Sequence, residues 1–305
     1  MDVLKTDNLT KNFEGKKAVD SLSLSVPENS VFGFIGPNGA GKTTTMRMIL
    51  GLLKPSGGSI TVCGEQVVYG QTGTNRFIGY LPDVPEFYSY MNAHEYLKLC
   101  GEVTGMQAPR IRTRSDELLH MVGLSDVRKR IGGYSRGMKQ RLGIAQAMLN
   151  EPKLLLCDEP TSALDPIGRK EILDILRAAR GKTTVLFSTH ILSDVESVCD
   201  RVAVLREGKL ALWGTIAGIK ARHRHDSLAV EFVSSADMAA FAALPGIEPY
   251  LANAERTEKG ILIRSSDIGK AESSVLIALA GSELLPQRLE ILEPTLENLF
   301  LEAVQ

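Results

Sequence analysis

The chain has 305 residues, of which 44% are hydrophobic, and its formal net charge at pH 7 is −1. Because a single domain usually has roughly 100 to 200 residues, this length predicts two domains. The near-neutral charge argues against a protein that binds nucleic acid or an anionic membrane surface by electrostatic attraction.

The first recognisable feature is a phosphate-binding loop in its expected context. Strands are predicted at residues 3–9 and 18–26, with a polar turn around 11–17. Residues 30–35 read as a buried strand, and residues 44–53 as a helix with a capping threonine at its start. Between them, residues 36–43 read Gly-Pro-Asn-Gly-Ala-Gly-Lys-Thr, which predicts a nucleoside triphosphate site.

Each residue type in this loop has a physical role. Gly36, Gly39 and Gly41 permit positive φ angles that turn backbone N–H groups toward one concavity, where phosphate oxygens fit. Lys42 is expected to reach the β and γ phosphates, and the Thr43 hydroxyl to bind Mg²⁺. The alternative is a glycine-rich turn that matches the pattern by chance.

The middle of the chain alternates between helices and strands. After a turn at residues 55–58 and a strand at 59–62, residues 94–150 have a helical pattern that indicates an insertion. Three further strands are predicted, with helices between them: strands at 154–157, 184–188 and 201–205, and helices near 168–179 and 191–198. This alternation predicts an α/β fold with a parallel sheet and ligands at the carboxyl ends of the strands.

Candidate catalytic residues follow two of these strands. Asp158 is expected to hold Mg²⁺, directly or through water, and Glu159 to orient and deprotonate the attacking water. His190 is placed to donate to the γ phosphate or to help hold that water. An acidic pair or a lone histidine at a strand end is more often an ordinary polar residue, but the upstream phosphate loop favours the catalytic interpretation.

The C-terminal part differs in charge from the rest. Residues 226–305 carry 5 basic and 13 acidic side chains, whereas residues 1–225 carry 30 and 23. Strands at 227–233 and 260–264 and a helix at 268–280 indicate a small α+β domain. We therefore divide the chain into residues 1–220, with a helical subdomain at about 84–150, and an accessory domain at 221–305 whose role the sequence does not indicate.

Cysteine spacing and hydropathy indicate the cellular compartment of the protein. Cys63, Cys100, Cys157 and Cys199 include no Cys-x-x-Cys pair, so neither a zinc site nor a disulfide framework is expected, which fits a reducing cytosol. The N-terminal residues do not have the pattern of a signal peptide, and no apolar stretch approaches the ~20 residues of a membrane helix. We expect a chain that is itself soluble.

Six ordered motifs over roughly residues 3–215 resemble the ATP-binding subunit of an ATP-binding cassette (ABC) transporter. Besides the phosphate loop, they include the signature segment Tyr-Ser-Arg-Gly-Met-Lys-Gln-Arg at 134–141, Asp-Glu-Pro-Thr at 158–161, the D-loop at 162–165 and His190 as the switch histidine. The resemblance implies a P-loop NTPase core with a mainly parallel sheet, an N-terminal antiparallel β subdomain and a helical insertion. It also implies ATP and Mg²⁺ as ligands.

The resemblance extends to individual site residues. It implies that the rest of the phosphate loop, namely Pro37, Asn38, Ala40 and Thr44, shares the ATP site. It further implies that Ser135, Gly137 and Asp165 act on the nucleotide of a second subunit in a head-to-tail dimer. Ser135 and Gly137 precede a predicted helix at 138–149 whose positive end suits an anion. Ser135 as a plain helix cap is the alternative.

The chain departs from the usual family pattern at three positions. Arg136 stands where the family usually has Gly, and Met138 where it usually has Gln, a variant that resembles the ABC-2 type branch that exports drugs, peptides or lipids. Asp83 replaces the usual Gln; its carboxylate can still bind Mg²⁺ but is shorter and adds a negative charge. The alternative for Asp83 is an exposed turn residue between two prolines.

Aromatic residues indicate two further contacts. Phe13 lies where the family stacks an aromatic ring on adenine; because stacking selects a flat ring more than a particular base, GTP is a second possible nucleotide. Residues 84–91 include Phe87, Tyr88 and Tyr90, and the resemblance implies a docking groove there for the coupling helix of a membrane subunit. Core packing is the alternative in both cases. Residues 293–300 resemble the tail of exporter ATPases.

These features predict an ATPase whose two copies close on ATP and power export through separate membrane permease subunits, on the cytoplasmic face of the membrane and without nucleic acid. A soluble ABC ATPase of DNA repair or translation is the alternative. Repair proteins split the cassette with long coiled coils, whereas only 92 residues separate Lys42 from Ser135, and translation factors carry two cassettes, whereas one phosphate loop occurs here.

Overall fold

The structure is a computed structural model that describes residues 2–222, 227–252, 254–265 and 267–292. Its internal contacts divide the chain into two compact units, one ending at Ile216 and the other starting at Ala217. None of the described helices combines the length and the apolar character that crossing a bilayer requires.

The first unit begins with an antiparallel sheet of order β2-β1-β4-β5. Its strands are β1 (Asp2–Phe13), β2 (Lys16–Pro27), β4 (Gly57–Val62) and β5 (Glu65–Gln66). A turn lies within the predicted residues 11–17 but is narrower than predicted, because the strands run on to Phe13 and resume at Lys16. Glu14 and Gly15 have φ angles of 40° and 86°, and two positive φ angles make the tight hairpin turn that matches the twist of its strands.

The second sheet of this unit has six strands in the order β10-β9-β3-β8-β7-β6. They are β3 (Val31–Ile35), β6 (Ile78–Leu81), β7 (Leu154–Asp158), β8 (Thr184–Thr189), β9 (Arg201–Arg206) and β10 (Lys209–Thr215). All neighbours pair in parallel except β10 with β9. The apolar runs of β3, β7 and β8 are buried on both faces, as a covered parallel sheet requires. The predicted mainly parallel α/β core is confirmed.

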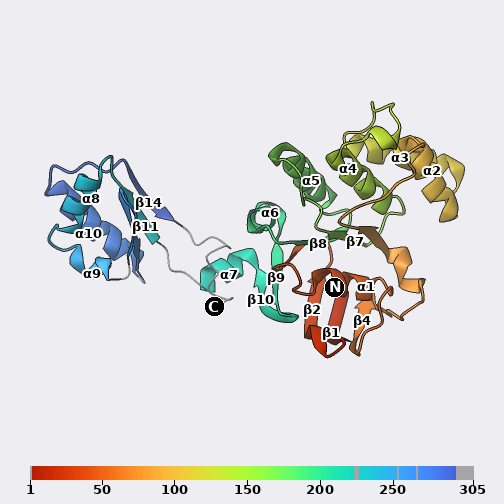
Figure 1. Cartoon of the computed structure of the whole chain (residues 1–305), viewed down its shortest axis with the longest axis horizontal. Helices are drawn as coiled ribbons and strands as arrows, with labels where there is room; N and C mark the ends of the chain where they lie inside the picture. The colour runs from red at the N-terminus through yellow and green to blue at the C-terminus, as the bar shows by residue number, and fades with distance from the viewer. Residues whose placement is uncertain (1, 223–226, 253, 266, 293–305) are drawn as a thin grey trace. The chain divides into compact units, whose positions relative to one another are not determined.

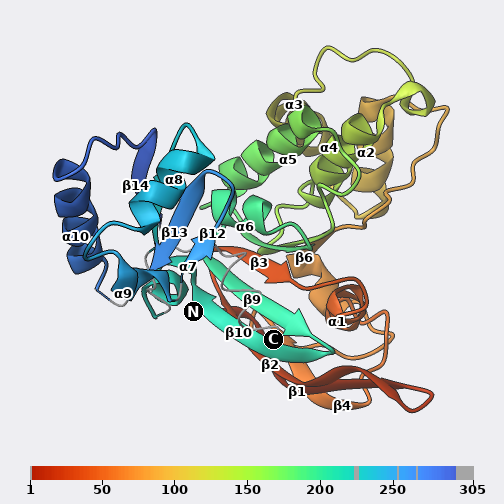
Figure 2. The ribbon, with the colours of Figure 1, turned by 60° about the vertical axis from the view of Figure 1, so that its left-hand side comes forward.

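The core of the first unit lies between the two sheets. Helix α1 (Lys42–Ile49) supplies Met46 and Met48, which pack with Phe32 and Phe34 of β3 and with apolar residues of the antiparallel strands. Figure 2 shows β1, β2 and β4 beneath the β9–β10 pair, and the Asp20 N–H donates to Gly208 O at 2.8 Å where the sheets meet. The predicted capping threonine is wrong: α1 begins at Lys42, and Gly41 precedes it without any side-chain cap.

The predicted helical insertion between β6 and β7 is confirmed. It contains α2 (Ala93–Val103), α3 (Ala108–Met121) and α4 (Arg136–Ala147), with the short 3₁₀ helix η2 (Ile131–Gly133) before α4; another, η1 (Gly73–Phe77), precedes β6. Helices α5 (Pro166–Ala179) and α6 (Leu192–Val198) follow β7 and β8. Figure 1 shows α2 to α5 grouped on the side of the parallel sheet opposite β1 and β2.

The second unit is a small α+β domain, as predicted. Helix α7 (Ile216–Arg222) follows β10, and a sheet of order β12-β13-β11-β14 comes after it. Its elements are β11 (Ser227–Glu231), α8 (Ser235–Ala242), α9 (Glu248–Leu251), β12 (Glu255–Arg256), β13 (Gly260–Arg264), α10 (Ile268–Ala280) and β14 (Arg288–Leu292). Apart from the short extra helix α9, the order is the β-α-β-β-α-β of ferredoxin-like folds. Phe232 and Phe241 pack in its own core. The tail motif at residues 293–300 lies outside the described residues.

Candidate nucleotide-binding site

The phosphate loop connects β3 to α1, and close backbone contacts require glycine at two of its positions. Gly41 has a φ of 101°, and a Cβ there would lie 2.4 Å from Ala18 O. A Cβ on Gly36 would lie 2.6 Å from Leu205 O. A larger residue at either position displaces the loop from the strands β2 and β9 that hold it. At Gly41 the positive φ also requires glycine, whereas Gly36 does not have the positive φ that the sequence predicted.

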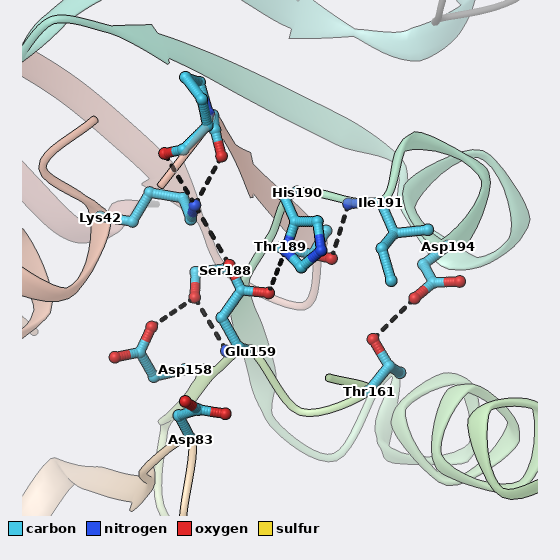
Figure 3. A network of polar contacts seen from close by, with 12 residues as sticks. Lys42, Asp83, Asp158, Glu159, Thr161, Ser188, Thr189, His190, Ile191 and Asp194 are labelled. Atoms are coloured by element: carbon cyan, nitrogen blue, oxygen red, sulfur yellow. Dashed lines mark hydrogen bonds and ion pairs between the residues drawn. The ribbon is translucent and has the colours of Figure 1, made fainter. Parts of the chain in front are cut away.

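Lys42 lies beneath the loop and is only 6% exposed. Its Nζ donates to Gly36 O at 2.6 Å and to Pro37 O at 3.3 Å, and lies 3.1 Å from Glu159 Oε1. Figure 3 shows these contacts converging on the ammonium group. The buried positive charge is therefore balanced by one carboxylate from the end of β7.

The carboxylates predicted from the sequence lie at the end of β7, beside β8. Asp158 pairs in register with Ser188; the Ser188 hydroxyl donates to Asp158 Oδ1 at 2.6 Å and accepts from the Glu159 N–H at 3.0 Å. Glu159 has a φ of 46°, a left-handed conformation that is unfavourable for a non-glycine residue. Ser188 thus holds the backbone and the first carboxylate of the site in one arrangement.

His190 completes a linked row of polar side chains. Its Nδ1 lies 2.9 Å from Glu159 Oε2, on the opposite carboxylate oxygen from the one that faces Lys42. The structure therefore brings together Lys42, Glu159 and His190, three residues that are up to 148 positions apart in the sequence. Glu159 is oriented from both sides, which is the arrangement that a general base requires.

The residues present fit a divalent cation that is shared with phosphate. Thr43 is the second residue of α1, and Asp158 is largely buried nearby at the end of β7. Asp83 Oδ1 is buried without a hydrogen bond in the described part of the chain. No group of three or more His, Cys, Asp or Glu side chains in that part is placed to hold a metal ion by itself. A cation here would depend on phosphate oxygens, as Mg²⁺ sites commonly do.

Asp83 is more than an exposed turn residue. Burial raises the pKa of its carboxyl above the ordinary value of 3.8, and the nearby carboxylates of Asp158 and Glu159 raise it further, whereas Arg136 lowers it. Arg136 Nη2 lies 3.5 Å from Asp83 Oδ1. Asp83 therefore belongs electrostatically to the same acidic group as the carboxylates at the end of β7 (Figure 3).

The signature and D-loop residues start two helices. The Ser135 hydroxyl accepts from the Met138 N–H at 3.2 Å and caps α4, which does not decide whether Ser135 also acts on a second subunit. Gly137 is the second residue of α4, and Asp165 caps α5 by accepting from the Gly168 N–H at 3.0 Å. In the described chain, no hydrogen bond or ion pair links these three residues to Lys42, Asp158 or Glu159.

The aromatic predictions are resolved in part. Phe13 lies at the tip of the β1–β2 hairpin, 46% exposed, with Lys11 Nζ 4.8 Å from its ring centroid, so its assignment to the core is wrong. In residues 84–91, Phe87 packs edge-on against Tyr96 at 5.0 Å, whereas Tyr88 and Tyr90 are exposed. A groove of about 480 Å³ runs beside this segment, and its lining includes Val84, Phe87 and Arg136.

Sequence reasoning missed a buried polar network behind the site. Asp194 of α6 is almost fully buried; it accepts from the Thr161 hydroxyl at 2.7 Å and lies 2.5 Å from Arg169 Nη2 of α5. This network ties the segment after Glu159 to two helices, and Figure 3 shows the contact between Thr161 and Asp194. Asp194 does not lie in a recognisable motif, and its partners are distant in the sequence, so no local signal could have identified the network.

Comparisons with known proteins agree with this geometry. Residues 19–162 match the family model described as ABC transporter. The chain is 46% identical to the uncharacterized ABC transporter ATP-binding protein YxlF of Bacillus subtilis over 219 residues, 72% of each chain. It is 43% identical to the bacitracin transport ATP-binding protein BcrA of Bacillus licheniformis over 68% of each chain. It is 34% identical to the daunorubicin resistance ATP-binding protein DrrA3 of Streptomyces coeruleorubidus, over 98% of this chain and 94% of that one.

Solved structures show the same similarity. One, titled as the structure of the ATP binding subunit of an ABC transporter, superposes with a TM-score of 0.65 at 30% identity, over 72% of this chain and 92% of that one. CbiO1 from Clostridium perfringens gives a TM-score of 0.67 at 29% identity, over 72% and 91%. The chain belongs to the ABC transporter family and contains its ATP-binding ATPase domain.

Proposed function

We propose that this chain is the ATP-hydrolysing subunit that powers export of a substrate through a separate membrane-spanning permease. The single observation that carries the catalytic part is the Lys42–Glu159–His190 row next to the phosphate loop. The export part is supported by two relatives whose names describe bacitracin transport and daunorubicin resistance. The second of these aligns with nearly the whole chain.

Nucleotide binding rearranges contacts that are already present. The N–H groups of Gly39, Gly41 and their non-proline neighbours in the loop donate to phosphate oxygens at the start of α1. Lys42 leaves Glu159 and binds the β and γ phosphates, and the exposed ring of Phe13 stacks on the base. Thr43 and Asp158, with Asp83 beside them, are the residues that would hold Mg²⁺, which supplies charge neutralisation on the phosphates when bound.

Hydrolysis follows from the position of Glu159. Its carboxylate takes a proton from water while the water oxygen forms a bond to the γ phosphorus. The bond between that phosphorus and the β–γ bridging oxygen breaks, and the electron pair leaves with ADP. His190 holds Glu159 in orientation through the 2.9 Å contact and donates to the γ phosphate.

Two copies are proposed to complete each site. Ser135 and Gly137 at the start of α4 and Asp165 at the start of α5 have no hydrogen bond or ion pair with the phosphate loop of their own chain in the described residues. In a head-to-tail dimer they face the nucleotide of the partner subunit. ATP binding then closes the dimer, and hydrolysis reopens it.

The groove beside residues 84–91 is the proposed docking site for the permease. Acidic Asp83 and Glu86 and basic Arg136 and Lys139 line a partly apolar surface, which suits a short amphipathic helix. Docking there would place the subunit on the cytoplasmic face of the membrane, peripheral to it. The same groove contains Asp83, so the permease contact and the nucleotide site share a residue.

Purification of the tagged chain from detergent-solubilised native membranes tests this proposal. We expect an integral membrane protein in fixed stoichiometry, ATP hydrolysis by the complex, and loss of the membrane protein when Glu86 and Lys139 are replaced together by alanine. Recovery only from the soluble fraction, bound to nucleic acid or ribosomes, would contradict the proposal and support the soluble alternative.

A further inference from the structure

The loop that contains Asp83 is joined to the signature helix by two contacts. Gln140 of α4 is fully buried, and its Nε2 donates to Asp83 O at 2.6 Å. Arg136, the first residue of the same helix, lies 3.5 Å from the Asp83 carboxylate. The backbone contact holds the loop in place, whereas the side-chain pair can separate without moving the loop.

The Asp83 carboxylate is incompletely paired. A charge-assisted hydrogen bond is about 2.7–2.9 Å long, so the 3.5 Å contact with Arg136 is loose. Asp83 Oδ1 is buried and accepts no hydrogen bond in the described residues. Figure 3 shows Asp83 beside Asp158 and Glu159, whose negative charges act on it. A cation that enters this acidic group therefore competes with Arg136 for Asp83.

We propose that Asp83 exchanges Arg136 for the nucleotide-bound metal ion, and that the released Arg136 becomes a donor to the triphosphate of the partner subunit. This inference rests on the proposed composite site. Arg136 stands between Ser135 and Gly137, which are proposed to face that triphosphate, and its side chain is partly exposed. A guanidinium binds phosphate oxygens through two parallel hydrogen bonds.

The exchange links the two nucleotide sites. When the nucleotide site of a chain is empty, Asp83 of that chain holds Arg136. When the site is loaded, Arg136 is free to bind the triphosphate in the site of the partner subunit. Two of the three departures from the usual family pattern, Asp83 and Arg136, then act as one unit, because a Gln at position 83 and a Gly at position 136 make no charge pair. Arg136 acts on the metal only through Asp83, as a positioning residue.

Metal affinity tests the exchange without measuring turnover. Mn²⁺ serves as a paramagnetic probe for Mg²⁺, and free Mn²⁺ is followed by electron paramagnetic resonance in the presence of a non-hydrolysable ATP analogue. Arg136→Gln removes the competitor, so Mn²⁺ is expected to bind about 3-fold to 10-fold more tightly, whereas Asp83→Asn is expected to weaken binding about 10-fold. The double variant is expected to match Asp83→Asn. Arg177→Gln, which breaks the exposed pair with Asp174 on α5, is the control.

A second measurement separates the exchange from a structural role. Sedimentation with the ATP analogue should show that Arg136→Gln forms less dimer than the wild type although it binds the metal more tightly, and that Arg136→Lys recovers part of the loss. Unchanged or weaker Mn²⁺ binding in Arg136→Gln overturns the inference, as does an effect of Arg136→Gln that persists when Asp83 is already Asn. If the wild type binds no metal–nucleotide complex, the proposed function itself fails.

Discussion

Lys42 Nζ lies 3.1 Å from Glu159 Oε1, so the residue proposed to hold the phosphates is paired with the residue proposed to activate water. The second oxygen of Glu159 faces His190. A triphosphate that takes Lys42 must therefore replace the Glu159 carboxylate. The same event frees one oxygen of Glu159 for water. Glu159 therefore becomes available as a base when ATP binds.

Replacement of Glu159 by Gln tests this coupling. Hydrolysis is expected to slow by about 10²-fold or more, because the base is removed. ATP is expected to bind at least as tightly as in the wild type, because its phosphates no longer compete with a charged carboxylate for Lys42. Steady-state turnover and titration with a fluorescent ATP analogue measure the two effects.

A matched control for this variant is Glu258→Gln, which changes the same residue type at an exposed position of the second unit. It should alter neither turnover nor binding. Full turnover in Glu159→Gln would refute the role of Glu159 as the base, and weaker ATP binding would refute the competition for Lys42.

The buried Asp194 network is expected to support the stability of the first unit. Asp194→Ala leaves the Thr161 hydroxyl and Arg169 without their acceptor, at an expected cost of about 2–4 kcal/mol in the free energy of unfolding. Asp174→Asn, which breaks an exposed pair with Arg177, should change stability by less than about 1 kcal/mol. Urea denaturation measures both, and equal losses in the two variants would contradict the assigned role.

Alanine substitutions at two glycines with positive φ angles distinguish the cost of backbone strain from the cost of a steric clash. Gly181 has a φ of 79° and open space around its Cβ position, so Gly181→Ala should cost about 1 kcal/mol. Gly41→Ala adds a contact of 2.4 Å with Ala18 O, so we expect a larger loss of stability and a displaced phosphate loop. Thermal unfolding of the two variants, compared at equal pH, checks the difference. A Gly41 variant as stable as the Gly181 variant would show that the loop tolerates the added methyl.

The raised pKa of Asp83 predicts a pH-dependent effect of Asp83→Asn. A carboxyl whose pKa is raised on folding stabilises the fold while it is protonated, and this contribution is lost as the pH rises from the ordinary value of 3.8 through the raised value. Because asparagine stays neutral, the stability of the variant relative to the wild type should improve as the pH rises above the ordinary value of 3.8. Denaturation curves at several pH values test the direction; a relative stability that declines over this range would mean that Arg136 outweighs burial.

Local patterns predicted much of the first unit. The apolar runs of β3, β7 and β8 and the residues of the phosphate loop are read directly from neighbouring positions, because burial on both faces and loop geometry leave short, continuous signals. The turn after Phe13 was placed too broadly, since its polar residues continue both strands on the exposed surface.

Contacts between distant residues could not be predicted in the same way. Three such contacts join segments that come together only when the helices pack on the sheet: the Lys42–Glu159 pair, the Asp83–Arg136 pair and the Asp194 network. The sequence marked Asp83 and Arg136 as departures from a pattern, but only the fold shows that they face each other. The order of strands in the second unit likewise depends on pairings that have weak local signals.

Complementation between two inactive variants tests most directly whether two copies complete each site. Lys42→Ala disables the phosphate loop of one chain, and Ser135→Arg blocks the signature of another. An equimolar mixture should hydrolyse ATP well above the sum of the separate variants, because the mixed dimer contains one intact loop facing one intact signature. A mixture no more active than that sum, while the wild type hydrolyses ATP at the same concentration, would contradict the composite site.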